Sequence, residues 1–171
     1  MRIAPEEVLL EPATVPASPA LERDSPDDGL FRRGVIFSDG DIPKPPAWFR
    51  AGAVDGLAYA AHRATRLAIR RGPSAGILLA GYAICTISGE DDGDAIAERL
   101  YRRLIAGEDA FYAELNTLNG RYVVAFRRGG GWRFVNDAAG LRSLFFGQAP
   151  SGHFVATHLR LIRMQAPDMP A

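Results

Sequence analysis

Short apolar runs between turn-forming residues recur along this chain, and such runs are typical of buried β-strands. They predict strands at residues 35–37, 77–84, 121–127, 132–135, 144–146 and 154–156. A helix is expected across residues 55–70, where helical spacing connects Leu57, Ala61, Ala64 and Ala68. Another helix is expected after Asp92 or Asp94, either of which is placed to cap it, and it buries Ile96, Leu100 and Leu104. Gly107 interrupts it, and further helical segments are expected at residues 108–118 and 158–164.

Several predicted strands are apolar on both faces. Residues 77–79, 122–126 and 144–146 show no alternation of apolar and polar side chains. A strand that faces water on one side would alternate, so these strands require cover above and below. The turn segments 128–131 and 148–152 join consecutive strands and favour antiparallel pairing. The sequence therefore predicts an α+β fold in four layers, an α-β-β-α sandwich of two antiparallel sheets covered by helices.

The distribution of prolines divides the chain into a domain and its flanks. Residues 1–30 contain five prolines among acidic residues and alanines, which predicts a flexible Pro-rich N-terminal arm. Residues 31–165 form the expected domain, and residues 166–171 a short tail. A length of 171 residues is enough for one domain with a substantial core.

Composition narrows the expected partners and location. The chain has 20 basic and 20 acidic residues, so its charge gives no long-range attraction for nucleic acid or a membrane, and neither is an expected partner. Cys85 is the only cysteine, which excludes an internal disulfide and suits a reducing compartment. No apolar run is long enough for a membrane span and the N-terminus does not resemble a secretory signal, so the expected location is cytoplasmic.

Three segments in the second half of the chain carry a family resemblance. Residues 118–126 read Leu-Asn-Gly-Arg-Tyr-Val-Val-Ala-Phe and resemble the Leu-Asn-Gly-x-Phe-Ala-Phe-Ala segment of asparagine synthetases. Residues 136–146 resemble the family's Arg-Asp-x-x-Gly-x-x-Pro-Leu-Tyr-Tyr segment, and residues 154–162 its Phe-Ala-Ser-Glu-x-Lys-x-Leu segment. Order and spacing agree in all three. The chain therefore resembles the N-terminal class II (type 2) glutamine amidotransferase domain of that family, which has the Ntn-hydrolase fold.

The resemblance also suggests ligand-binding residues. Residues 80–83 stand where the family has its Asn-Gly-Glu-Ile-Tyr-Asn strand, which implies that Gly81 lies at the glutamine pocket. Asp94 stands where the family has the aspartate that holds the glutamine amine. Residues 70–73 are similar to the family's His-Arg-Gly-Pro, although the chain between the two segments is shorter than in the family.

The residues that perform the family's chemistry are not found. The chain begins Met-Arg-Ile, whereas the family's nucleophile is an N-terminal cysteine whose own amine acts as the base. Ser38 follows its strand instead of starting one, and Ala80 replaces the asparagine of the oxyanion site. A Ser-Gly-Gly-x-Asp-Ser pyrophosphate loop is also missing, and Gly129 to Gly131 form a hairpin turn. We therefore expect no catalytic residue and no cofactor.

The remaining candidates for chemistry have simpler structural roles. Cys85, at the end of an apolar strand, is expected to pack as a small hydrophobe. His62 is expected to be solvated on its helix, His153 to lie near a turn, and His158 to pack or cap after the last strand. Three scattered histidines form no metal signature.

Asp137, Gly140 and Arg142 are expected to build a structural turn. The carboxylate of Asp137 would accept backbone hydrogen bonds, Gly140 would adopt a conformation that other residues resist, and Arg142 is placed to pair with Asp137.

Three functions fit this sequence. The first is a non-catalytic amidotransferase-like domain that acts as a binding or scaffold partner of a separate amide-forming, synthetase-type biosynthetic enzyme. Exposed Trp48 and Phe49 and the N-terminal arm would supply its contact surface, although Trp48 is also placed to cover the core. The second is a glutamine-hydrolysing asparagine-synthetase-like subunit or fragment. The third is an amino-acid-sensing ligand-binding domain. The expected partner of the chain is a biosynthetic enzyme or a second copy of the chain in a homo-oligomer.

Overall fold

Residues 31–166 are described by the computed structural model, and they contain nine strands and three helices. The predicted arm at residues 1–30 and the tail beyond Ala166 lie outside the described residues. The elements are β1 Val35–Ser38, β2 Phe49–Val54, β3 Leu57–His62, β4 Leu67–Arg71, β5 Ala75–Cys85, α1 Gly93–Ala106, α2 Glu108–Leu115, β6 Leu118–Arg128, β7 Arg133–Asn136, β8 Phe145–Ala149, β9 Gly152–Ala156 and α3 Leu159–Gln165.

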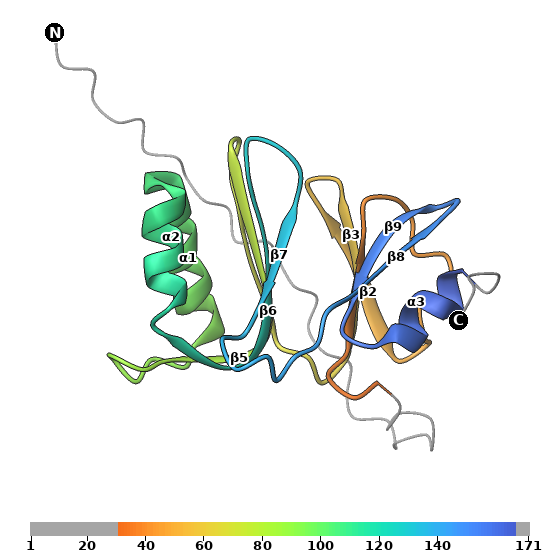
Figure 1. Cartoon of the computed structure of the whole chain (residues 1–171), viewed down its shortest axis with the longest axis horizontal. Coiled ribbons are helices and arrows are strands. Elements are labelled where there is room, and N and C mark those ends of the chain that lie inside the picture. Colours follow the sequence, from red (N-terminus) through yellow and green to blue (C-terminus); the bar gives the residue numbers. More distant parts are fainter. Residues whose placement is uncertain (1–30, 167–171) are drawn as a thin grey trace, which may run out of the picture.

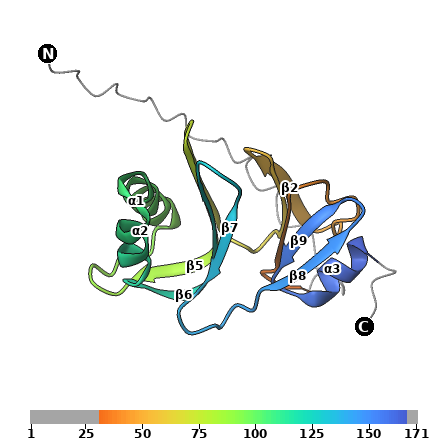
Figure 2. The ribbon, with the colours of Figure 1, turned by 45° about the horizontal axis from the view of Figure 1, so that its top comes forward.

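The strands form two antiparallel sheets that lie face to face (Figure 1). One sheet has the order β2-β3-β1-β9-β8, and the other has the order β4-β5-β6-β7. Helices α1 and α2 cover the outer face of the second sheet, and α3 covers the outer face of the first (Figures 1 and 2). The predicted α+β class with two antiparallel sheets between helices is confirmed.

Three apolar clusters hold these layers together, and they explain why β5 and β6 are apolar on both faces. The expectation that residues 144–146 are covered on both faces is wrong, because Phe146 is 67% exposed on the edge strand β8. Along β5, Ile77 and Leu79 pack in the cluster formed with α1 and α2. The alternate residues Leu78 and Ala80 pack in the cluster between the two sheets. A third cluster, which includes Phe154, joins the first sheet to α3. Successive residues of a strand point to opposite faces, so a strand between two cores needs apolar residues at every position.

The helix predicted across residues 55–70 is wrong. This segment forms β3, a turn and the start of β4. Leu57 and Ala61 do lie on one buried face, but β3 pairs along its length with both β1 and β2. Alanine favours a helix in isolation, yet pairing on two sides supplies hydrogen bonds and burial that outweigh this weak preference.

The start of that segment carries a sequence signal for a hairpin turn. Asp55-Gly56 connects β2 to β3, with φ of 46° and 80° at the two residues. Asp-Gly between two strands is a preferred two-residue hairpin turn, because both positions need positive φ. Strand β2 was not predicted, and the expectation that Phe49 is exposed is wrong, since Phe49 is 9% exposed and packs against α3's cluster. Trp48 is partly buried beside it, as expected of a side chain that covers the core.

The other predicted elements are confirmed, with small shifts at their ends. Helix α1 is capped by Asp92, whose carboxylate accepts a hydrogen bond from the backbone N–H of Asp94, and it ends at Gly107. Helix α2 stops at Leu115 because β6 already begins at Leu118. The β6–β7 and β8–β9 hairpins and the final helix occur where the sequence placed them. No helix within residues 31–166 has both the length and the apolarity to cross a membrane.

Candidate functional site

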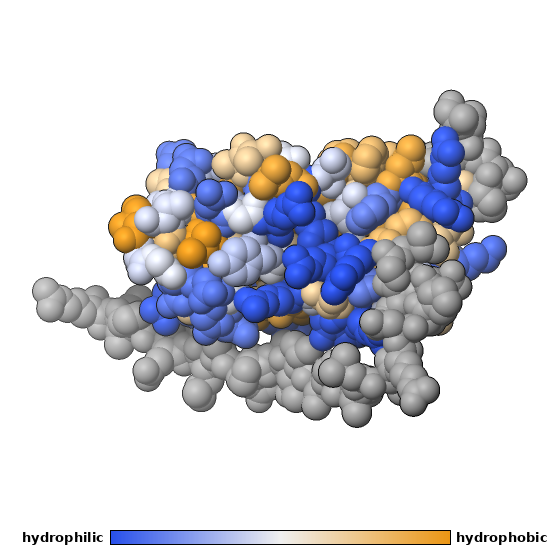
Figure 3. Space-filling view, turned by 90° about the horizontal axis from the view of Figure 1, so that it is seen from below, coloured by the Kyte–Doolittle hydropathy of each residue, from blue (hydrophilic) through white to orange (hydrophobic). Residues whose placement is uncertain are grey.

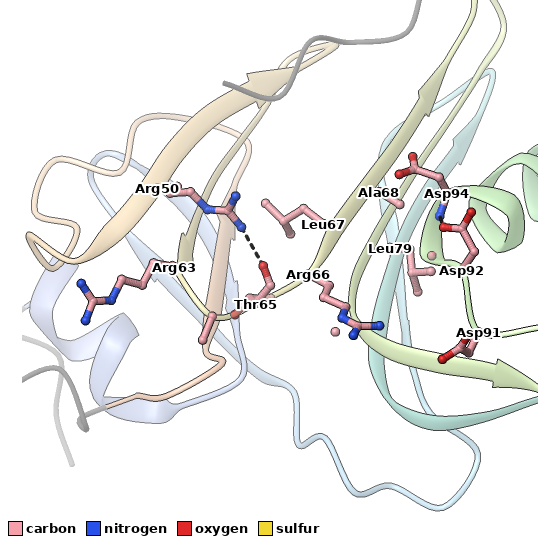
Figure 4. Close-up of a pocket in the computed structure, with 13 residues that line it drawn as sticks. Arg50, Arg63, Thr65, Arg66, Leu67, Ala68, Leu79, Asp91, Asp92 and Asp94 are labelled. Atoms are coloured by element: carbon pink, nitrogen blue, oxygen red, sulfur yellow. Dashed lines mark hydrogen bonds between the residues drawn. The ribbon is translucent and has the colours of Figure 1, made fainter. Parts of the chain in front are cut away.

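A cavity of about 610 Å³ lies beside the chain that crosses from β3 to β4 and reaches the start of α1 (Figure 4). Sheet, crossover and helix each contribute to its wall. The lining residues are Arg50, Arg63, Ala64, Thr65, Arg66, Leu67, Ala68, Leu79, Gly81, Asp91, Asp92, Gly93 and Asp94. We call this space the large cavity.

Arg50 and the aspartates near the start of α1 stand on opposite sides of the large cavity, and Arg66 lies between them (Figure 4). Arg50 of β2 lies on one side, where its guanidinium donates a hydrogen bond of 2.7 Å to the carbonyl of Thr65. Asp92 and Asp94, at the start of α1, lie on the other side. Arg50 Nε is buried without a hydrogen-bond partner. This separation of charge suits a ligand that carries both an anionic and a cationic group.

The two residues that the resemblance places at a ligand pocket, Gly81 and Asp94, both line the large cavity. Asp94 Oδ1 lies 2.9 Å from Arg70 Nη1 in an ion pair, and the Asp94 side chain is 65% exposed. Gly81 has φ of 120°, and a Cβ there would collide with the carbonyl oxygen of Arg121. Ala80, in contrast, is buried in the core between the sheets. Gly81 and Asp94 thus line the same cavity, although they are 13 positions apart in the sequence.

A second, smaller cavity of about 120 Å³ adjoins the first and shares Ala64, Thr65, Arg66 and Gly81 with it. We call it the small cavity. Its other lining residues are Arg33, Tyr82, Arg121 and Arg142. The Thr65 hydroxyl donates a hydrogen bond of 3.1 Å to the carbonyl of Gly34, just before β1. Arginine is therefore the dominant charged residue at this end of the site.

The turn formed by residues 137–142 positions one of these arginines. The Asp137 carboxylate accepts hydrogen bonds of 2.9 Å from the backbone N–H of Leu141 and 2.8 Å from that of Arg142. Gly140 has φ of 65°, as expected of a residue in a left-handed turn. The predicted turn is present, but Asp137 binds the backbone of Arg142, while the Arg142 guanidinium donates to the carbonyl of Arg33.

Cys85 lies apart from both cavities. It is 4% exposed and belongs to the cluster under α1 and α2, in line with its expected role as a small hydrophobe. Hydrogen bonds from the hydroxyl and backbone of Ser88, the backbone of Ile87 and the hydroxyl of Thr117 nevertheless lower the pKa of the Cys85 thiol to about 6. Cys85 is not among the residues that line either cavity.

The histidines occupy three unrelated environments. The expectation that His62 is solvated is wrong, because it ends β3 and is 2% exposed, and its Nδ1 accepts a hydrogen bond from the backbone of Ala64. His153 lies in a strand beside a turn, 2.8 Å from Asp39 Oδ2. His158 precedes α3 and lies 3.0 Å from the Thr157 hydroxyl, where burial lowers its pKa. Within residues 31–166, no three His, Cys, Asp or Glu side chains gather as a metal site.

A scan against protein-family models finds no match for this sequence, and a search of curated proteins finds no significant relative. The likeness to amidotransferases therefore rests on the three sequence segments alone. Sequence reasoning singled out Gly81 and Asp94, which line the large cavity, and did not single out the arginines of the small cavity. They come from four separate segments, so no local pattern connects them.

Proposed function

We propose that this chain is a non-catalytic amidotransferase-like domain of the Ntn-hydrolase type that binds a separate amide-forming, synthetase-type enzyme. Two stacked antiparallel sheets between helices are the architecture that this family resemblance implies. The three matching segments also fall on consecutive elements, namely β6, the β7–β8 connection with β8, and β9 with α3.

The observation that carries the non-catalytic part is the side-chain content of the cavities. Among the lining residues, Thr65 is the only one with an aliphatic hydroxyl, and none carries a thiol. The Thr65 hydroxyl donates to the carbonyl of Gly34, and within residues 31–166 it forms no hydrogen bond with a carboxylate or imidazole of the lining. Nucleophilic catalysis needs a hydroxyl or thiol that a base within hydrogen-bonding reach can deprotonate. The cavity supports binding and lacks this pair.

Exposed apolar side chains near the end of the chain offer a surface for the partner. Phe146 on β8 is 67% exposed and Leu141 in the preceding turn is 53% exposed. Leu159 at the start of α3 is 39% exposed, and α3 packs beside β8. Strand β8 is also an edge of its sheet, so its outer backbone groups are open to pairing with another chain. These residues replace buried Phe49 as the proposed contact surface.

Glutamine turnover tests the non-catalytic part directly. Glutamate release from glutamine would be measured for the full chain and for Cys85→Ala, with an authentic glutamine amidotransferase as the positive control. We expect no release above the buffer rate in either protein. Turnover that disappears in Cys85→Ala would instead establish the glutamine-hydrolysing alternative.

A second candidate function, amino-acid binding in the large cavity, is favoured by the charges on its two sides. A free amino acid has a carboxylate and an ammonium group, which would face Arg50 or Arg66 and Asp94 respectively. Thermal unfolding would be followed with each amino acid added, in the full chain and in Asp94→Ala. Glu98→Gln is the matched control, because Glu98 also pairs with Arg70 but does not line the cavity. Absence of any shift in the full chain would end this candidate.

A further inference from the structure

The small cavity is lined by four arginines, and the only charged side chains among its described lining residues are theirs. Arg33 lies just before β1, and Arg66 lies in the crossover before β4. Arg121 belongs to β6, and Arg142 lies in the β7–β8 connection. Within residues 31–166, none of the four forms an ion pair with a carboxylate. Figure 3 shows hydrophilic residues gathered near the middle of the face that contains the β3–β4 crossover. Like charges held together in this way create a local potential that attracts anions.

Some arginines elsewhere in the described part of the chain do pair with carboxylates. Arg70 pairs with Asp94 and Glu98, Arg127 pairs with Asp55, and Arg133 pairs with Glu108. Arg99 and Arg103 both pair with Glu114. The small cavity differs from these sites because its four arginines converge from separate segments on one space.

Arg142 is held close to its neighbours by the fold. Its guanidinium donates to the carbonyl of Arg33, and its own carbonyl accepts a hydrogen bond of 2.8 Å from the Asn136 side chain. Burial lowers the pKa of the Arg142 guanidinium, and the nearby charges of Arg121 and Arg33 lower it further. Arg33 has φ of 60°, an uncommon conformation for a residue other than glycine. The three cations are thus close enough to act on one bound group.

We propose that Arg33, Arg121 and Arg142 bind a phosphate group in the small cavity, either inorganic phosphate or the phosphate of a small ester. Guanidinium groups present paired N–H donors that match two phosphate oxygens, and several of them together balance a doubly charged anion. A volume of about 120 Å³ accommodates one such group. The body of an ester would extend past Arg66 and Gly81 into the large cavity, because both cavities share these residues. This proposal does not depend on the amidotransferase likeness.

Calorimetric titration of the full chain, in a phosphate-free buffer of low ionic strength, tests the proposal. Inorganic phosphate and glycerol 3-phosphate are the probes, and the variants are Arg33→Gln and Arg121→Gln. Both residues are exposed, so their replacement leaves the core intact, and thermal unfolding would verify this. Arg71→Gln is the matched control, because Arg71 is an exposed arginine at the end of β4 that lines neither cavity.

We expect saturable binding to one site, weakened about tenfold or more by each cavity variant, as the loss of a charged hydrogen bond predicts. Arg71→Gln should bind like the unchanged chain. Tighter binding of glycerol 3-phosphate would identify an ester as the ligand, and equal binding would identify phosphate itself. Absence of saturable binding, or equal weakening by Arg71→Gln, would overturn the proposal.

Discussion

Asp137 shows how one buried side chain shapes the site. It is 3% exposed, and its two carboxylate oxygens bind the backbone N–H groups of Leu141 and Arg142. These bonds fix the turn that brings the Arg142 guanidinium to the carbonyl of Arg33 across the molecule. A structural turn and a candidate binding site therefore depend on the same carboxylate.

Asp137→Ala should lower the free energy of unfolding by about 3 kcal/mol, because two buried backbone donors lose charge-assisted hydrogen bonds. Chemical denaturation would measure the change. Asp41→Ala is the control, since Asp41 is exposed and has no hydrogen bond recorded within residues 31–166, and it should change stability by no more than about 0.5 kcal/mol. Equal effects of the two substitutions would show that the Asp137 bonds contribute little.

The Cys85 thiol should titrate with a midpoint near pH 6, because hydrogen bonds from Ser88 and Thr117 stabilise the thiolate. Absorbance of the thiolate at about 240 nm would follow the titration, with Cys85→Ser as the blank. Ser88→Ala should raise the midpoint, since Ser88 is the largest cause of the shift. A midpoint near 8.5, the ordinary value for cysteine, would contradict the prediction.

The same shift has a consequence for stability. A thiol whose pKa is lower in the folded protein than in the unfolded chain stabilises the fold most fully above the unfolded value of about 8.5. This contribution declines as the pH falls through the folded pKa of about 6. The stability difference between the unchanged chain and Cys85→Ser should therefore grow as the pH rises through this window.

At the scale of elements, the clearest lesson comes from the contrast between β5 and β3. Strand β5 was predictable because it is buried on both faces, which requires an unbroken apolar run that few helices show. Strand β3 was missed because its alanines fit helical spacing equally well, and only its pairing with β1 and β2 decides the outcome. The apolar pattern of a segment predicts its secondary structure when burial alone determines that structure. The pattern is not sufficient when pairing with distant strands determines it.

The start of α1 offers a test of a predicted element boundary. The Asp92 carboxylate accepts a hydrogen bond of 3.0 Å from the backbone N–H of Asp94, which satisfies one of the free donors at the helix start. Asp92→Ala should destabilise the protein by about 1 kcal/mol in thermal or chemical unfolding. Asp91→Ala, one residue earlier and exposed, is the control and should have little effect. The prediction fails if both substitutions act alike.

At the scale of the whole molecule, the sequence was sufficient for the two antiparallel sheets and the helices that cover them. Strands with apolar residues on both faces, together with hairpin turns, indicated two antiparallel sheets covered by helices. The family resemblance suggested Gly81 and Asp94 as ligand-binding residues, and both line the large cavity. The small cavity was beyond reach, because Arg33 and Arg142 are 109 positions apart and meet only through the folded turn. Residues that converge from four segments become a candidate site only in three dimensions.

The molecule as a whole is proposed to work as a binding domain, so its association with an enzyme is the most direct test. The chain would be co-expressed with an ATP-dependent amide-forming enzyme encoded beside it, and the mixture examined by size-exclusion chromatography with light scattering. We expect the two proteins to elute as one complex of defined stoichiometry, and Phe146→Glu, on exposed β8, to separate them. Separate elution of the unchanged chain, or the lack of any such enzyme encoded nearby, would contradict the account.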